Sequence, residues 1–279
     1  MTQTSSPTGA AAPARSDDGA DAIVAAAARA RAGGLVITPT DTVYGIGTTA
    51  ADASAVARLL AAKGRGRQMP PPVLVAGRDQ LDGVVADPPP AARALMDALW
   101  PGALTIVLDA APALSWDLGE TGGTIAVRMP DHPLALALLR AAGPMAVTSA
   151  NPTGAEPATD ADSAARAFPG RVTGSPDALA AVGAEGDEGG EPSILLIHGG
   201  PTPGPVPSTI VSVAGDDAAR PRVLREGLIR LLTEVGHEVV AALPDAVGLM
   251  DSLACDPPDF CILDVRLPPT FTDEGVRAA

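Results

Sequence analysis

Residues 33–47 read G-G-L-V-I-T-P-T-D-T-V-Y-G-I-G, and residues 63–67 read K-G-R-G-R after an alanine-rich segment. The apolar, β-branched run 35–38 predicts a buried strand, which Pro39 ends because proline has no backbone N–H. Asp52 to Ser54 predict a helix start, since short oxygen-bearing side chains cap exposed N–H groups. A hydroxyl-rich loop at 38–42 and a cationic loop at 63–67 together predict a site for a small polar substrate beside a phosphate.

Composition and charge narrow the class of protein. The chain has 279 residues, and its 19 Lys and Arg against 33 Asp and Glu give a net charge of −14, which argues against a general nucleic-acid binder. Neither a membrane-spanning apolar run nor a signal-peptide pattern stands out in the sequence. Cys255 and Cys261 suit neither a disulfide framework nor a metal quartet, so we expect a cytoplasmic protein without a metal site of its own.

Strand-like and helix-like segments follow one another along the chain. Residues 1–19 have the composition of a disordered tail, and residues 174–190 that of a mobile acidic insertion. Predicted helices cover 20–32, 53–63, 90–99, 134–142 and 160–167, and predicted strands 35–38, 70–76, 103–108, 124–129, 145–148, 194–197 and 209–213. This mixture predicts an α/β fold with a twisted mixed sheet flanked by helices. Polar residues beside several strand ends, at 38–42, 128–132, 149–151 and 207–209, predict a shared pocket.

Seven short motifs occur in an order that resembles one protein family. They are T-P-T-D-T-V-Y-G-I-G (38–47), K-G-R (63–65), W-P-G-A-L-T (100–105), T-I-A-V-R-M-P-D-H-P (124–133), T-S-A-N-P-T-G (148–154), G-G-P-T-P-G (199–204) and P-S-T-I-V (207–211). The combination resembles the YrdC-like family of threonylcarbamoyl-AMP synthases over residues 20–227. Gly66 departs from the family pattern, which commonly has proline there, as do the P-G-P at 203–205 and the longer approach at 216–219.

The resemblance implies a reaction and its partners. Threonine and bicarbonate would form a carbamate, which attacks the α-phosphate of ATP with Mg²⁺ and releases pyrophosphate. The product, threonylcarbamoyl-AMP, would then serve tRNA modification through a separate threonylcarbamoyl-transferase complex. The implied fold is a YrdC-like twisted sheet with a concave cavity.

The resemblance also implies roles for individual side chains. Lys63 and Arg65 would stabilise charge on the phosphates, with Arg67 a weaker candidate because solvent is an equally good partner for it. The residues implied to bind threonine are Thr40, Arg128, Ser149 and Ser208. The residues implied to bind ATP, besides the two cations, are Thr124, Asn151, Thr159 and Arg225. His132 occupies a family position, where we expect a structural hydrogen bond rather than a catalytic base.

Each of these side chains also has an ordinary structural interpretation. Thr40 suits a turn, Ser149 a helix cap, Arg128 a surface ion pair, and Asn151 the start of a turn before Pro152. Lys63 and Arg65 taken alone suit a solvated helix end. The family context shifts the balance toward the functional interpretation.

The C-terminal residues 228–279 follow a different pattern. They resemble the front half of a response-regulator receiver domain, with Asp264 at the position of the phospho-acceptor. The acidic pair of the first strand and the later strands of that family have no counterpart. A fragment of about 50 residues is difficult to stabilise alone, so we predict that Asp264 is not phosphorylated.

Two other functions fit parts of the sequence. Gly45 to Ala50 match the G-x-G-x-x-A of a dinucleotide-binding domain, although the Pro39 loop separates them from the preceding strand. A non-catalytic RNA-binding module of the YrdC-like type is the other alternative, and the net charge of −14 argues against it.

Overall fold

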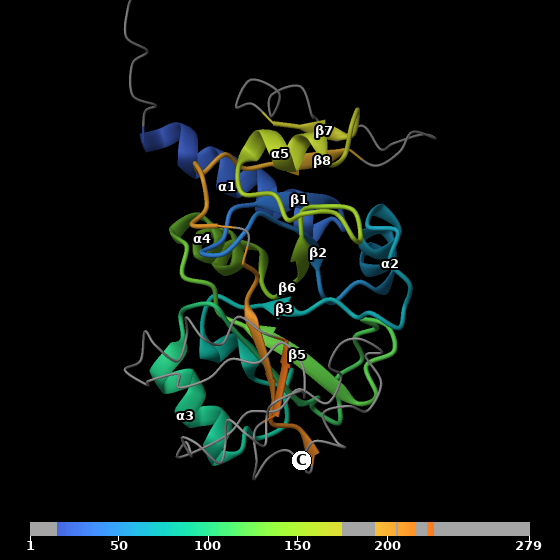
Figure 1. The fold of residues 1–279 in the computed structure, drawn as a ribbon, viewed down its shortest axis with the longest axis vertical. Coiled ribbons are helices and arrows are strands. Elements are labelled where there is room, and N and C mark those ends of the chain that lie inside the picture. Colours follow the sequence, from blue (N-terminus) through green and yellow to red (C-terminus); the bar gives the residue numbers. More distant parts are fainter. Residues whose placement is uncertain (1–15, 175–192, 205, 216–221, 226–279) are drawn as a thin grey trace, which may run out of the picture.

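The structure is a computed structural model that describes residues 16–174, 193–204, 206–215 and 222–225. Its described strands form one sheet in the order β10-β9-β4-β5-β3-β6-β2-β1-β8-β7 (Figure 1). The strands are β1 (Leu35–Thr38), β2 (Gly45–Thr49), β3 (Val73–Leu74), β4 (Leu104–Asp109), β5 (Thr124–Arg128), β6 (Met145–Ser149), β7 (Val172–Thr173), β8 (Ile194–Leu196), β9 (Thr209–Ser212) and β10 (Arg222–Arg225). The helices are α1 (Ser16–Arg31), α2 (Ala53–Ala62), the 3-10 helix η1 (Arg78–Leu81), α3 (Pro90–Leu99), α4 (Pro133–Ala142) and α5 (Ala161–Arg166).

The sheet is mixed, as the alternating strands and helices predict. Antiparallel pairing joins β1 to β2, β2 to β6, β3 to β6, β4 to β5 and β9 to β10, whereas β1–β8, β3–β5, β4–β9 and β7–β8 are parallel. Segments far apart in the sequence therefore lie side by side, and the site residues gather from several of them.

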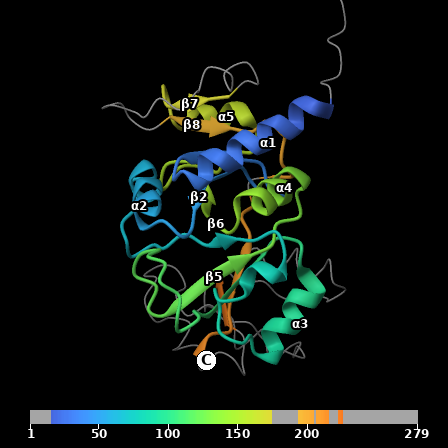
Figure 2. The same ribbon diagram turned by 180° about the vertical axis from the view of Figure 1, so that it is seen from behind.

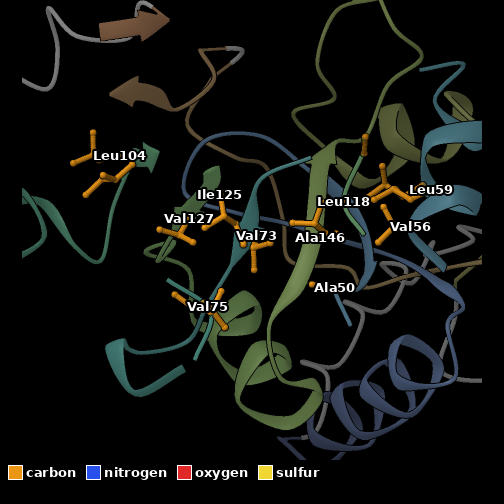
Figure 3. Close-up of a cluster of buried hydrophobic side chains, with 14 of the residues drawn as sticks. Ala50, Val56, Leu59, Val73, Val75, Leu104, Leu118, Ile125, Val127 and Ala146 are labelled. Carbon is orange, nitrogen blue, oxygen red and sulfur yellow. The ribbon is translucent and has the colours of Figure 1, made fainter. Parts of the chain in front are cut away.

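Alternate residues of the strands pack into two separate hydrophobic clusters, because successive side chains point to opposite faces of a sheet. One cluster contains Leu35 and Ile37. It also contains Val73, Val127 and Ala146 and receives Val56 and Leu59 from α2 (Figure 3). The other contains Val36, Leu74, Met145 and Val147 and receives apolar residues of α1 and α4. Figure 2 shows these two helices side by side on this second face.

Local chemistry explains where α2 begins and ends. The Asp52 carboxylate accepts hydrogen bonds from the backbone N–H groups of Ser54 (2.8 Å) and Ala55 (3.2 Å), which caps the helix as predicted. Gly64 follows the last turn with a φ of 60°, in the left-handed region that glycine adopts without steric cost. Lys63, the residue at the C-terminal end of α2, therefore has a fixed position.

Strand β2 is absent from the sequence prediction because its sequence, G-I-G-T-T, contains two glycines. The reason for them is a close approach to β6. A Cβ atom on Gly45 would lie 2.7 Å from Val147 Cγ1, and one on Gly47 would lie 2.6 Å from the Ala146 carbonyl oxygen. The dinucleotide-binding interpretation is thereby wrong, because these glycines lie within a strand and not in a turn leading into a helix.

Other boundaries differ in smaller ways. Helix α1 begins at Ser16, four residues before the start of the helix predicted at 20–32. The short strands β7 and β10 were not predicted either. The first 15 residues, most of the predicted acidic insertion and the receiver-like segment with Asp264 lie outside the described residues. Within the described part, no helix is both long enough and apolar enough to cross a membrane.

Candidate active site

The loop between β1 and β2 stands at the centre of the candidate site. Thr38 pairs with Gly45 across these strands, and Gly45 pairs with Ser149 at the end of β6. Tyr44 strengthens this junction, because its N–H donates to the Ala158 carbonyl (2.8 Å) and its carbonyl accepts from the Ala150 N–H (2.7 Å). The hydroxyl-rich loop and the S-A-N segment are thus neighbours.

Lys63 lies against the same S-A-N segment. Its Nζ donates to the Ser149 carbonyl (2.5 Å) and to the Asn151 carbonyl, with the Asn151 Oδ1 at 3.4 Å. The Lys63 carbonyl in turn accepts from the Thr153 hydroxyl (2.9 Å). Helix α2 and the segment after β6 therefore enclose the ammonium group. The sequence predicted the K-G-R and S-A-N motifs as two separate loops, and the structure brings them into contact.

Burial leaves Lys63 in an unusual electrostatic state. The side chain is only 2% exposed, and burial together with the nearby Arg65 lowers its pKa from 10.5 to about 7. No carboxylate pairs with it among the hydrogen bonds of the described residues; its acceptors are the neutral oxygens of Ser149 and Asn151. A buried cation without a counter-charge is a suitable partner for a phosphate.

The side-chain amide of Asn151 also forms hydrogen bonds within the site. Its Nδ2 donates to the carbonyls of Pro152 (3.0 Å) and Ala155 (2.6 Å), and the residue is buried. This is the turn-forming role of the structural interpretation, now combined with the contact to Lys63. Contact of Asn151 with a nucleotide stays a prediction.

The other two cations of the K-G-R-G-R run differ from each other. Arg65 has a buried Nε without a hydrogen-bond partner among the described residues, and burial lowers its pKa. Arg67 instead forms an exposed pair with Asp117, with Nη2–Oδ1 and Nη1–Oδ2 distances of 2.8 and 3.1 Å. The structure groups Arg65 with Lys63 and assigns Arg67 to a surface ion pair.

Arg128 forms a second polar group with residues of the same loop. Its Nη2 donates to Asp41 Oδ1 (2.6 Å), its Nη1 to the Thr42 hydroxyl (3.1 Å) and its Nε to the Gly102 carbonyl (2.9 Å). Burial lowers the pKa of Arg128, while the charge of Asp41 opposes that shift. The surface ion pair of the structural interpretation is therefore wrong in one respect, because this pair is buried.

Thr40 joins this group through a directed row of hydroxyls. Its Oγ1 donates to the Val43 carbonyl (2.6 Å) and lies 3.0 Å from the Thr42 Oγ1. Because a hydroxyl has one proton, Thr42 must donate to Thr40 while accepting from Arg128. The row runs from Arg128 through Thr42 and Thr40 to Val43, so Thr40 has the turn role, and its contact with threonine stays a prediction.

Ser208 lies near Arg128 by way of a neighbouring strand. Its Oγ is 2.9 Å from the Thr105 Oγ1, and both residues are buried. Thr105 precedes Ile106, which pairs with Val127, the residue before Arg128. Ser208, just before β9, is therefore linked through Thr105 of β4 to the strand that pairs with the one ending at Arg128.

The three remaining residues predicted to contact ATP, Thr124, Thr159 and Arg225, lie on three different segments of the chain. Thr124 begins β5, four positions before Arg128, and its hydroxyl donates to the Thr121 carbonyl (2.8 Å). Thr159 holds Thr202 through its carbonyl, with the N–H at 2.8 Å and the hydroxyl at 3.2 Å. Arg225 ends β10 opposite Ile210, and its side chain lies outside the described part.

His132 forms a structural hydrogen bond through its backbone. Its Nδ1 is buried without a partner among the described residues, and it is the carbonyl that accepts from the Leu136 N–H (2.9 Å) at the start of α4. Burial lowers the pKa of His132, against the opposing charges of Asp41 and Asp131. The imidazole is therefore neutral at pH 7.

Sequence reasoning named Asp41 and Thr42 as loop residues but gave them no role, and it gave none to Tyr44. The signal was present, since all three belong to the T-P-T-D-T-V-Y run. The Tyr44 hydroxyl donates to the Gly200 carbonyl (2.7 Å) and accepts from the Gly199 N–H (3.2 Å), so it ties the segment after β8 to the loop.

Comparison with known proteins shows which family the chain belongs to. The sequence model of the Sua5/YciO/YrdC family, described as "Telomere recombination", matches residues 28–227. The chain belongs to this family. The Sua5/YciO/YrdC relatives include a Mycobacterium tuberculosis protein with the provisional name of a threonylcarbamoyl-AMP synthase, 46% identical over 205 residues that cover 74% of this chain and 83% of the relative. The Bacillus subtilis threonylcarbamoyl-AMP synthase is 39% identical over 207 residues, 74% of this chain and 53% of the relative.

Solved structures of the family show the same fold. Pyrococcus abyssi Sua5 in complex with L-threonine aligns with a TM-score of 0.64 and 31% identity, over 81% of this chain and 60% of that protein. Escherichia coli YciO aligns with a TM-score of 0.58 and 25% identity, over 75% and 90% of the two chains. The predicted twisted mixed sheet flanked by helices is confirmed. The receiver-like C-terminal fragment finds no support in these comparisons, and the domain boundaries at 19 and 227 stay predictions.

Proposed function

We propose that this chain is an L-threonylcarbamoyl-AMP synthase, which forms threonylcarbamoyl-AMP and pyrophosphate from L-threonine, bicarbonate and ATP. The observation that carries the proposal is the position of the 38–45 loop. It contacts the Ser149–Asn151 segment that encloses Lys63, and its Asp41 and Thr42 bind Arg128. One short segment thereby connects a cationic group with a group of hydroxyls and an ion pair. The names of the M. tuberculosis and B. subtilis relatives support the same activity.

The chemistry assigned to each group follows from its charge. The carbamate formed from threonine and bicarbonate attacks the α-phosphorus of ATP, and the bond to the pyrophosphate oxygen breaks, which makes the enzyme a nucleotidyltransferase. Negative charge develops on the phosphate oxygens, and Lys63 and Arg65 stabilise it by electrostatic attraction. The Arg128 group and Ser208 hold threonine, and Thr124, Asn151, Thr159 and Arg225 complete the nucleotide contacts in this proposal.

Magnesium belongs to the proposal as part of the substrate. Among the described residues there is no group of three or more His, Cys, Asp or Glu side chains that could hold a metal ion. Mg²⁺ is commonly bound by phosphates and water with only one or two protein carboxylates, so it would arrive with ATP. Its chemistry would be to neutralise charge on the triphosphate. The product would pass to a threonylcarbamoyl-transferase complex that acts on tRNA.

Pyrophosphate release from the purified chain tests the proposal. We expect release only when threonine, bicarbonate and ATP are present together, and a loss of about 100- to 1000-fold in rate for Lys63→Ala, because one charge-stabilising donor is removed. Arg67→Ala, which alters an exposed cation of the same run, is the matched control and should retain the wild-type rate.

Two results would contradict the synthase. Pyrophosphate release without threonine would indicate another adenylating reaction. Absence of release under every condition, together with binding of RNA, would favour the non-catalytic RNA-binding module.

A further inference from the structure

The Asp41–Arg128 ion pair is buried but incompletely bonded. The side chains are 14% and 7% exposed, and one hydrogen bond of 2.6 Å joins them. A guanidinium has five N–H groups, and Arg128 uses three of them on Asp41, Thr42 and Gly102. Two N–H groups of Arg128 and most of the acceptor capacity of Asp41 are therefore without partners among the described residues.

This pattern differs from that of an ion pair that only supports a fold. Burying two charges is costly unless further hydrogen bonds satisfy their remaining donors and acceptors. The Arg67–Asp117 pair is exposed, so its desolvation cost is small, yet it forms hydrogen bonds through both carboxylate oxygens. The buried Asp41–Arg128 pair has a larger desolvation cost, yet some of its donors and acceptors are without partners among the described residues.

The available groups match one kind of ligand. A carboxylate would satisfy the free N–H groups of Arg128, and an ammonium would satisfy the free oxygen of Asp41. A molecule that carries both, as an α-amino acid does, would complete the pair without adding net charge to a buried place. A simple carboxylic acid would instead bring a second negative charge beside Asp41.

We propose that Asp41 is a specificity-determining residue that binds the α-ammonium group of the amino-acid substrate while Arg128 binds its carboxylate. The ion pair thus selects a zwitterion over a carboxylic acid. This inference rests on the proposed synthase function and assigns it a residue that sequence reasoning had left without a role. His132, the other titratable side chain whose ring experiences the charge of Asp41, is neutral at pH 7 and does not change this balance.

The test compares two ligands that differ only in the ammonium group. L-threonine and (R)-3-hydroxybutyrate share the carboxylate, the hydroxyl and the methyl group. Their affinities for the full chain are measured by titration calorimetry at pH 7.5 for the wild type, Asp41→Asn, Asp41→Glu and Thr42→Val. Thr42→Val is the matched control, because it removes a bond to Arg128 and leaves the charge of Asp41 in place.

We expect Asp41→Asn to weaken threonine binding by about 10- to 100-fold, the loss typical of a charged hydrogen bond. Binding of 3-hydroxybutyrate should stay unchanged or become tighter, because repulsion by the carboxylate is gone. Asp41→Glu should recover part of the preference for threonine, and Thr42→Val should weaken both ligands equally.

Equal weakening of both ligands by Asp41→Asn, or no weakening of either, would overturn the role of Asp41 even if the wild type releases pyrophosphate. A wild type that neither binds threonine nor releases pyrophosphate would overturn the synthase proposal, and this inference with it. Thermal unfolding of each variant, followed by circular dichroism, identifies any that has lost its fold, and Asp41→Glu then provides the decisive comparison.

Discussion

The Lys63 group and the Arg128 group are both buried cations at the β1–β2 loop, yet they are neutralised in different ways. Lys63 is held by backbone and amide oxygens of Ser149 and Asn151, which are neutral. Arg128 is held by the carboxylate of Asp41 and by neutral oxygens of Thr42 and Gly102. The first group therefore carries an uncompensated charge when protonated, and the second has a net charge close to zero.

The two groups are therefore suited to different ligands. An uncompensated cation attracts a polyanion such as a triphosphate, whereas a neutral pair accommodates a neutral zwitterion without leaving an unpaired buried charge. The two halves of the proposed reaction mixture, ATP and threonine, thus correspond in charge to the two halves of the site. Three experiments examine this contrast.

The largest expected effect concerns stability. Replacing Arg128 by Met leaves the Asp41 carboxylate buried without its counter-charge, and we expect the free energy of unfolding to fall by about 3–5 kcal/mol. Replacing Lys63 by Met removes its hydrogen bonds but also removes an ammonium whose burial lowers its pKa, and because these two effects oppose each other we expect a loss smaller than about 1 kcal/mol. Urea denaturation of the two variants measures both values. Equal losses would show that the two cations are neutralised in the same way.

The second effect concerns pH. The pKa of Lys63 is lowered to about 7, so the ammonium form predominates below pH 7 and is lost as the pH rises above it. Bound phosphates would favour the ammonium form, so ATP binding should take up a proton and weaken by up to about tenfold per pH unit above 7. Titration calorimetry of ATP between pH 7 and 8.5, in buffers with different heats of ionisation, measures both quantities.

Lys63→Arg is the control for this pH dependence, because a guanidinium stays charged throughout that range. We expect its ATP affinity to be independent of pH over the same interval, and the threonine affinity of the wild type to be independent as well. A pH dependence that persists in Lys63→Arg would have to come from a different group.

The smallest effect separates the two arginines of the cationic run. Arg65→Ala removes a partly buried guanidinium whose Nε has no partner in the part of the chain that the structure describes, and we expect ATP affinity to weaken by about tenfold. Arg67→Ala removes an exposed cation that is already paired with Asp117, and a change of less than about twofold is expected. A comparable loss in both variants would mean that Arg67 leaves Asp117 to reach the nucleotide.

The sequence indicated the parts of this fold that depend on local chemistry. The apolar runs of β1, β4, β5 and β6, the Asp52 cap and the turn at Gly64 all follow from residue types that act on their immediate neighbours. The long helices were predicted within a few residues of their ends for the same reason. Strand β2 was missed because its glycines are required by the close approach of Val147, which lies about 100 residues further along the chain.

The α/β class, the strand ends with their polar residues and, through the order of the motifs, the family could therefore all be predicted from the sequence. The polar residues that share a partner are seen in the three-dimensional structure alone: Lys63 contacts the carbonyls of Ser149 and Asn151, Asp41 pairs with Arg128, and Arg67 pairs with Asp117. The two kinds of feature differ in how far apart along the chain the interacting residues lie. A cap or a turn is set by atoms a few residues apart, whereas pairing of buried charges depends on which segments the sheet brings together, and that information is distributed over the register of every strand.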